Sequence, residues 1–413
     1  MSHMPCRKLF LILDIDGVLI ESHGYRQACV DTINDFLVQM GQPNLRIDRD
    51  VTDAFETAGI NAEWDMVPLA LAAFVNWYCG VSCSVPADEF PPRCTDFLIT
   101  DNAAFKEMML QQIADYSKHL NSTETAVNAI YHSYLRSDGK GLDKLWRLSF
   151  RDRFFVDTLD PWKCPFFAGL MCRILGADVF RRFYGMKAPV DCASYLITRD
   201  IPLISDKNRR LLQKMDGKDG IYPVVMTYRP SLYPVENGNN GNDHFVNTPE
   251  AECALHMLGW DDGRVQMIGA GSLFFIEEKK SLRREYYVKP HPFHALASVM
   301  TAICRNEIQA LEMAWKLCEQ DPKNEESPAA QWLFPGDDII LAVFEDSVSG
   351  IKSVRSAVET LREWGYNASG IYCGIKTTDV KNEMLTAENA VLYNDFNTAL
   401  DAVLAGFDPE RSK

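Results

Sequence analysis

Residues 9–22 read Leu9-Phe-Leu-Ile-Leu-Asp-Ile-Asp-Gly-Val-Leu-Ile-Glu-Ser22, a near-continuous apolar run that ends in two carboxylates, Asp14 and Asp16. An apolar run this short predicts a strand buried on both faces of a parallel sheet. Ligands bind at the carboxyl edge of such sheets, so Asp14 and Asp16 are candidates for a site. The simpler alternative is a strand followed by a turn whose acids are only solvated.

The composition limits the classes of protein to consider. A chain of 413 residues is long enough for two domains. Its 57 acidic and 42 basic residues give a net charge of −15, which argues against a nucleic-acid partner. No apolar stretch reaches the ~18 residues of a membrane span, and the run at 9–15 is expected to belong to the fold rather than to a secretion signal. The 12 cysteines include no C-x-x-C pair, so reduced thiols and a cytoplasmic location are expected. The composition leaves the oligomeric state open.

The pattern of apolar residues changes twice along the chain. A helix is expected at 24–40, and helical patterns rich in aromatic residues dominate from about 45 to 210. Strands and helices alternate after residue 200. We therefore expect an α/β fold, a Rossmann-like doubly wound parallel sheet built from residues 1–40 and 206–413, with residues 41–205 inserted as a mainly helical domain. The aromatic residues of the insertion suit either core packing or a ligand pocket.

Polar residues suited to phosphate chemistry follow several predicted elements. They are Asp14 and Asp16, Thr227, Lys289, and Glu345 with Asp346. Right-handed crossovers place the ends of parallel strands along one edge, so residues far apart in sequence converge there.

Each residue type has a chemical role to offer. A carboxylate such as Asp14 can attack phosphorus, and a second one, Asp16, can protonate the leaving oxygen and later activate water. Thr227 can hydrogen-bond phosphoryl oxygens, and Lys289 can neutralise the nucleophile and the phosphate. Mg²⁺ prefers hard oxygen ligands. The candidate ligands for Mg²⁺ are Asp14, Asp16, Glu345 and Asp346.

Four motifs, in order, make the chain similar to the haloacid dehalogenase (HAD) superfamily of phosphotransferases. Asp14-Ile-Asp-Gly-Val18 resembles the first motif of that family, and Met226-Thr-Tyr-Arg-Pro230 resembles the second, with Tyr228 in place of the usual glycine. Lys289-Pro-His-Pro292 and Phe344-Glu-Asp-Ser-Val-Ser-Gly-Ile351 resemble the third and fourth motifs. The resemblance implies Asp14 as nucleophile, Asp16 as acid/base, Thr227, Tyr228 and Lys289 at the phosphate, and a magnesium ion.

The same resemblance implies that the helical insertion is a cap that selects the substrate. We expect a Mg²⁺-dependent phosphate-ester hydrolase that acts on a small phosphorylated molecule through an aspartyl-phosphate. The aromatic insertion suggests a bulky or apolar substrate such as a terpenoid or prenyl phosphate, although a large insertion also needs aromatic residues for its own core. The alternatives are a phosphomutase or other phosphotransferase, and a non-catalytic binding protein with a HAD core.

Overall fold

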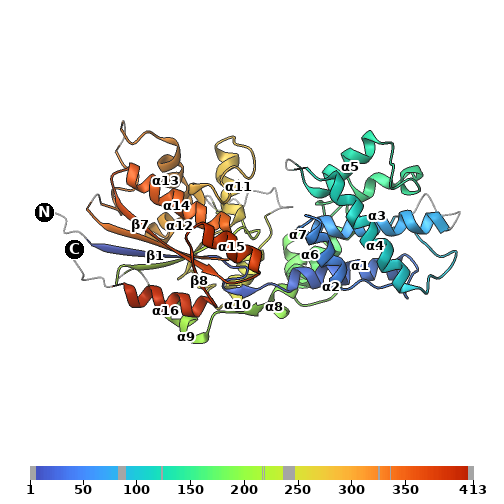
Figure 1. Ribbon diagram of the computed structural model, residues 1–413, viewed down its shortest axis with the longest axis horizontal. Coiled ribbons are helices and arrows are strands. Elements are labelled where there is room, and N and C mark those ends of the chain that lie inside the picture. The colour runs from blue at the N-terminus through green and yellow to red at the C-terminus, as the bar shows by residue number, and fades with distance from the viewer. Residues whose placement is uncertain are drawn as a thin grey trace. The chain divides into compact units, whose positions relative to one another are not determined.

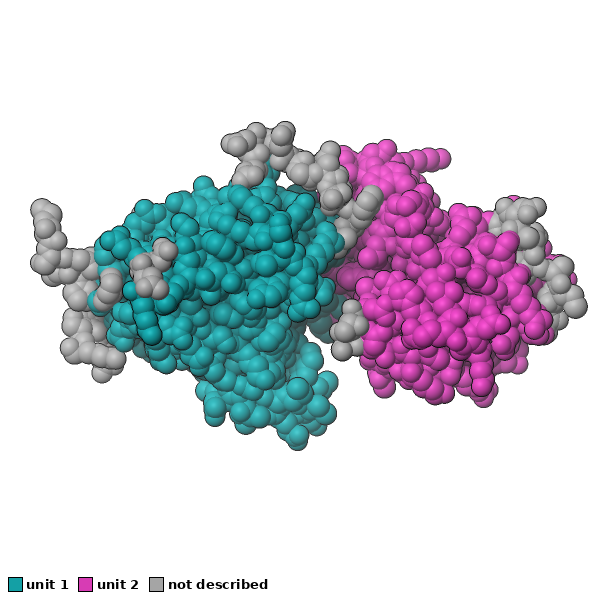
Figure 2. All heavy atoms as spheres, turned by 90° about the horizontal axis from the view of Figure 1, so that it is seen from above, with its two compact units in different colours: residues 1–22, 200–413 teal, residues 23–199 magenta. Residues whose placement is uncertain are grey.

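The computed structural model describes residues 6–81, 90–121, 124–215, 217, 219–235, 247–323, 326–334 and 336–407. The chain divides into two compact units, shown in Figure 2. Unit 1 comprises residues 1–22 and 200–413, and unit 2 comprises residues 23–199.

This division corrects the expected boundaries at 40/41 and 205/206. Helix α1 (Gly24–Gln39) packs against α3 (Glu63–Val81) and α6 (Pro165–Leu175), so it belongs to unit 2 rather than to the sheet. The chain has also returned to unit 1 by Asp200.

The chain passes between the units through two paired segments of unit 1. Strands β2 (Ile20–Glu21) and β3 (Ile201–Pro202) are antiparallel, with Glu21 opposite Ile201. The backbone N–H of Leu203 adds a hydrogen bond of 2.8 Å to the carbonyl of Leu19. A two-stranded ribbon therefore joins the segments that lead into and out of unit 2.

Unit 1 contains a six-stranded sheet in the order β5-β4-β1-β6-β7-β8, with every neighbouring pair parallel. The strands are β1 (Arg7–Leu13), β4 (Ile221–Met226), β5 (Gln266–Ile268), β6 (Asp338–Glu345), β7 (Asn367–Ile375) and β8 (Val391–Tyr393). The chain runs outward from β1 through β4 to β5, then returns to β6 on the other side of β1. The crossover direction therefore changes beside β1, which is where open α/β sheets bind ligands.

Helices cover both faces of the sheet (Figure 1). Phe10 and Ile12 of β1 pack on one face, and Leu9, Leu11 and Leu13 pack on the other. Both sets are buried because helices lie over each face, which accounts for the continuous apolar run. The Rossmann-like α/β architecture expected from the sequence is confirmed. The helices are α11 (Ala270–Lys279), α12 (Pro292–Cys304), α13 (Glu307–Glu319), α14 (Val348–Glu363) and α15 (Asp379–Ala387) on the first face, with α9 (Asp206–Lys214), α10 (Glu250–Met257) and α16 (Phe396–Gly406) on the second.

Unit 2 is mainly helical, and aromatic side chains fill its interior. Phe154, for example, packs against Phe166 with ring centroids 5.5 Å apart, and both rings are fully buried. Core packing thus accounts for many of the aromatic residues seen in the sequence. Besides α1, α3 and α6, its α-helices are α2 (Arg49–Thr57), α4 (Asn102–Tyr116), α5 (Ala126–Arg136), α7 (Ala177–Tyr184) and α8 (Tyr195–Thr198).

Two findings bear on the class of protein. None of the described helices combines the length and the apolar character needed to cross a membrane. Each cysteine in the described ranges is a free thiol.

Candidate active site at the carboxyl edge of the sheet

Asp14 lies at the end of β1, beside the end of β6. Its backbone N–H donates to the carbonyl of Phe344 at 3.1 Å, so the pairing of the two strands continues to the site. Gly17 turns the chain with φ +75°, and a Cβ atom at Gly17 would lie 2.9 Å from Oδ2 of Asp346. Only glycine permits this conformation and this approach, so the turn after β1 packs directly on the residue that follows β6.

Lys289 joins the ends of the two strands. Its Nζ atom lies 2.6 Å from Oδ1 of Asp14 and 2.6 Å from Oε1 of Glu345. The Lys289 side chain is 8% exposed. Burial alone would lower the pKa of Lys289, but the charges of Asp14 and Glu345 outweigh burial and raise it. Lys289 therefore remains an ammonium group between two buried carboxylates.

Glu345 organises the turn into α14. Its Oε2 atom accepts hydrogen bonds from the backbone N–H groups of Asp346 and Ser347, both at 3.0 Å, and from the Ser347 hydroxyl at 2.8 Å. A Cβ atom at Gly350 would lie 1.8 Å from Oε1 of Glu345. Because Gly350 has no side chain, α14 can begin against the buried carboxylate of Glu345. This contact explains the spacing between Glu345 and Gly350 in the fourth motif.

Three carboxylates meet at this edge. Asp14, Glu345 and Asp346 each offer an oxygen, and these oxygens lie within 4.8 Å of one another. We call these three residues the acid cluster. Asp346 also accepts a hydrogen bond of 2.9 Å from Nζ of Lys381 on α15. Burial raises the pKa of Asp14, and nearby Glu345 and Asp16 raise it further, against the opposing effect of Lys289.

The acid cluster suits a hard divalent cation. Its three groups supply only oxygen ligands, and Mg²⁺ is bound in proteins through a few carboxylates completed by substrate phosphate and water. Crowded carboxylates repel one another, which a divalent ion would relieve. The donor set therefore fits Mg²⁺, with Asp14, Glu345 and Asp346 as the candidate ligands.

Asp16 is not one of the three residues of this cluster, and its expected place among the Mg²⁺ ligands stays a prediction. Its carboxylate accepts hydrogen bonds from Arg229 Nε at 2.9 and 3.1 Å, from Arg229 Nη2 at 2.6 Å, and from the Ser22 hydroxyl. Arg229 also donates to the buried Asp200 at 3.1 Å. Burial would raise the pKa of Asp16, but the charge and hydrogen bonds of Arg229 lower it. Asp16 is thus held as a carboxylate facing a guanidinium.

Thr227 and Tyr228 follow β4, the neighbour of β1 in the sheet. The buried Thr227 hydroxyl oxygen accepts the backbone N–H of Arg229 at 3.1 Å. The Tyr228 hydroxyl donates to Glu285 at 2.7 Å, and its side chain is partly exposed. None of the hydrogen bonds among the described residues joins either side chain to the acid cluster. The structure places both residues at the expected edge but does not link them to the carboxylates.

Sequence reasoning assigned no role to four residues that complete this site: Ser22, Asp200, Arg229 and Lys381. Arg229 stands inside the second motif, two residues after the candidate phosphate-binding Thr227, which was an available signal, and Ser22 only ends the stretch 9–22. Asp200 and Lys381 lie outside every motif. Only the folded chain brings them to Arg229 and Asp346.

Comparison with known proteins supports the fold alone. No protein-family model matches the sequence, and no curated protein matches it at a significant level. A crystal structure described only as a target of the Northeast Structural Genomics Consortium is similar, with a TM-score of 0.58 and 16% sequence identity. The match covers 97% of this chain and 99% of that chain. Both units therefore have counterparts in a solved protein of similar length.

Proposed function

We propose that this protein is a Mg²⁺-dependent phosphate-ester hydrolase of the HAD kind, in which Asp14 is the nucleophile. The observation that carries the proposal is the meeting of the Asp14, Glu345 and Asp346 carboxylates with the Lys289 ammonium at the edge beside β1. Carboxylates brought together under burial are costly unless they serve a cation or a reaction. The four motifs in HAD order give the same assignment from the sequence.

In the proposed reaction, a carboxylate oxygen of Asp14 attacks the phosphorus atom and the bond to the ester oxygen breaks. Lys289 fixes Asp14 and offsets negative charge that develops on the phosphoryl group. Mg²⁺ at the acid cluster would supply further positive charge to the phosphoryl oxygens. Water then attacks the aspartyl-phosphate, releases inorganic phosphate and restores Asp14.

Asp16 is the proposed acid and base of these two steps. It lies two residues after the nucleophile, and Arg229 holds its carboxylate in place. The ionised form that Arg229 favours is the form that accepts a proton from the attacking water. To protonate the leaving oxygen in the first step, Asp16 must already carry a proton, either from solvent or kept from the water it deprotonated in the previous turnover, and this requires it to loosen its contacts with Arg229 and Ser22.

Unit 2 corresponds to the cap in this proposal and selects the part of the substrate beyond the phosphate. Phe154 and Phe166 illustrate how the aromatic residues of unit 2 are used in its core. The apolar substrate remains a prediction, to be tested by a screen of sugar phosphates, nucleotides, phosphoglycolate and isoprenoid phosphates at fixed Mg²⁺. Highest specificity constants for small polar phosphates would contradict it.

The decisive experiment replaces the nucleophile. Asp14→Asn should lower turnover of the best phosphate ester by several orders of magnitude, because the covalent intermediate cannot form. Asp262→Asn removes an exposed acid of unit 1 and serves as the control. Wild-type turnover in Asp14→Asn would falsify the assignment.

Two further readouts separate the alternatives. Release of inorganic phosphate in step with substrate loss indicates hydrolysis, whereas substrate conversion without phosphate release indicates a phosphomutase or another phosphotransferase. If calorimetry detects no Mg²⁺ binding to the wild-type chain, a binding protein with an inactive core becomes the better explanation.

A further inference from the structure

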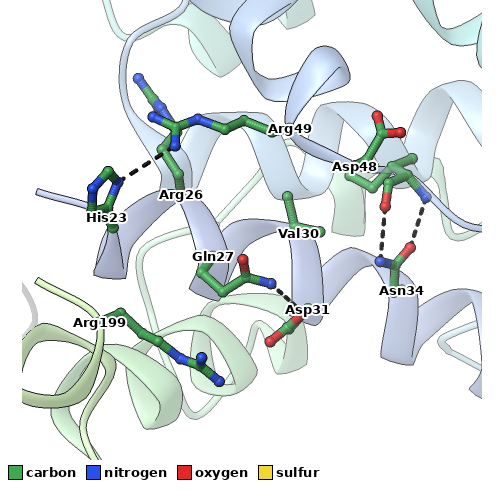
Figure 3. Close-up of a pocket in the computed structure, with 10 residues that line it drawn as sticks. His23, Arg26, Gln27, Val30, Asp31, Asn34, Asp48, Arg49 and Arg199 are labelled. Carbon is green, nitrogen blue, oxygen red and sulfur yellow. Dashed lines mark hydrogen bonds between the residues drawn. The ribbon is translucent and has the colours of Figure 1, made fainter.

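Unit 2 contains a cavity of about 420 Å³ along one face of α1 (Figure 3). Its α1 residues recur at helical spacing, among them Gln27, Val30 and Asn34, and His23 immediately precedes the helix. The other lining residues are those that lead into α2, together with Arg199 at the end of unit 2. All of them belong to unit 2, so the cavity shares no residue with the acid cluster of unit 1.

Hydrogen bonds between two residues fix one part of the cavity lining. The Asn34 side chain makes two hydrogen bonds with the backbone of Ile47, accepting its N–H at 2.8 Å and donating to its carbonyl at 3.0 Å. Figure 3 shows this pair of bonds. Val30 and Ile47 are buried beside it. This part of the lining thus combines apolar side chains with polar groups that already have partners.

The two acidic residues of the lining, Asp31 and Asp48, also have hydrogen-bond or ion-pair partners. Asp31 accepts hydrogen bonds from the Gln27 amide and from the Tyr195 hydroxyl, both at 2.8 Å. Asp48 forms an ion pair with Lys106, outside the cavity. The donors to Asp31 are neutral, so Asp31 keeps its negative charge, but among the described residues neither carboxylate forms an ion pair with an arginine of the lining.

Two of the three arginine residues of the lining are not neutralised by a close carboxylate among the described residues. Arg26 is neutralised by Glu56 and Glu63. Among the described residues, Arg49 has one distant, exposed ion pair, with Nε 3.8 Å from Asp53, and its Nη1 atom lies 3.4 Å from His23 Nδ1. An exposed pair at that separation neutralises little charge.

Arg199 is the second available cation. Its guanidinium carbon lies 5.5 Å from the centroid of the Tyr195 ring. Within the described residues, no carboxylate lies within 4.0 Å of the Arg199 guanidinium. Arg49 and Arg199 come from elements on either side of α1, and Figure 3 shows both at the cavity with the α1 side chains between them. In a chain of net charge −15, two such guanidinium groups at one cavity form an unusual positive site.

We propose that this cavity binds the phosphate group of a small organic phosphate. Guanidinium groups match phosphate oxygens in charge and in planar hydrogen-bond geometry. The apolar side chains of Val30 and Ile47 in the lining accommodate carbon atoms of the ligand. This site goes beyond the proposed catalytic function, since it uses no residue of the acid cluster and needs no metal.

The test is a calorimetric titration of the full chain with glycerol 3-phosphate in EDTA, where Mg²⁺-dependent turnover cannot occur. We expect saturable binding of one ligand per chain, with no heat from glycerol alone. Arg199→Gln and Arg49→Gln should each raise the Kd at least tenfold. Arg182→Gln removes an exposed arginine of α7 and should leave the Kd unchanged. Far-UV circular dichroism verifies that each variant is folded.

Three results would overturn the proposal: no saturable binding to the wild-type chain, equal affinity in Arg199→Gln and Arg182→Gln, or loss of binding in Lys289→Met. The last would place the phosphate at the acid cluster instead. Wild-type turnover in Asp14→Asn would contradict the proposed catalytic function but would not change the result of this titration, because binding is measured without catalysis.

Discussion

Replacing Lys289 by methionine tests the electrostatics of the candidate active site most directly. The Lys289 ammonium lies 2.6 Å from both Asp14 and Glu345, whose side chains are 10% and 1% exposed. Lys289→Met keeps the apolar stem and leaves two buried carboxylates without their cation. Breaking a buried ion pair in this way costs about 3–5 kcal/mol, so we expect that loss in the free energy of unfolding of unit 1 at neutral pH without Mg²⁺.

Lys381→Met is a matched control because it also removes an ammonium from the acid cluster. Lys381 lies 2.9 Å from Asp346, but its side chain is 51% exposed. Exposed pairs contribute about 0–1 kcal/mol, so this variant should be nearly as stable as the wild type. The difference between the two variants isolates the effect of burial.

The assay is urea unfolding in EDTA, with hydrogen exchange of β1 and β6 peptides reporting on unit 1. Asp14→Asn in the Lys289→Met background should restore part of the lost stability, because it removes one of the uncompensated charges. Equal losses in Lys289→Met and Lys381→Met would refute this account of the site.

Three other predictions concern single side chains. Gly350→Ala should destabilise unit 1 by about 1–3 kcal/mol in thermal unfolding, because its Cβ would lie 1.8 Å from Oε1 of Glu345; unchanged stability would mean that Glu345 can move. Asp346→Asn should raise the calorimetric Kd for Mg²⁺ at least tenfold, and an unchanged Kd would remove Asp346 from the metal site. Burial raises the pKa of Asp65 to about 6, despite its hydrogen bond from the backbone N–H of Ala126. The protonated Asp65 therefore favours the folded state below pH 4, and this contribution to stability is lost as the pH rises through 6. The free energy of unfolding of Asp65→Asn, measured relative to that of the wild type by urea unfolding, should therefore rise by about 3 kcal/mol from pH 4 to pH 7. Parallel pH profiles of the two proteins would contradict this.

The sequence was sufficient to predict the sheet and the convergence of the acids. The run before Asp14 and the apolar strand before Glu345 are local signals, and the rule that parallel strands end at one edge brings them together. The orientation of Asp16 was not predictable in this way. In the sequence it resembles the other acids, and its place is decided by Arg229, 213 residues away.

The boundary of unit 2 shows the same limit. The period of α1 predicts a helix with a buried face, but it does not indicate whether that face packs on a sheet or on other helices. The partners are α3 and α6, which lie far along the chain. Lys381 likewise lies in an ordinary amphipathic helix, and only the fold brings it to Asp346.

Because β2 and β3 are paired, unit 2 can be deleted and the two remaining parts of the chain joined. Because Glu21 pairs with Ile201, joining Ser22 directly to Asp200 would close the ribbon as a hairpin with a two-residue loop. Insertions are best tolerated where the ends of the inserted segment are close, and removal of an insertion follows the same rule. A chain shortened in this way keeps the acid cluster and the contacts of Ser22 and Asp200 with Arg229. It should fold and bind Mg²⁺ without the helical unit, and failure of a soluble, folded product to form would show that unit 1 depends on the inserted residues.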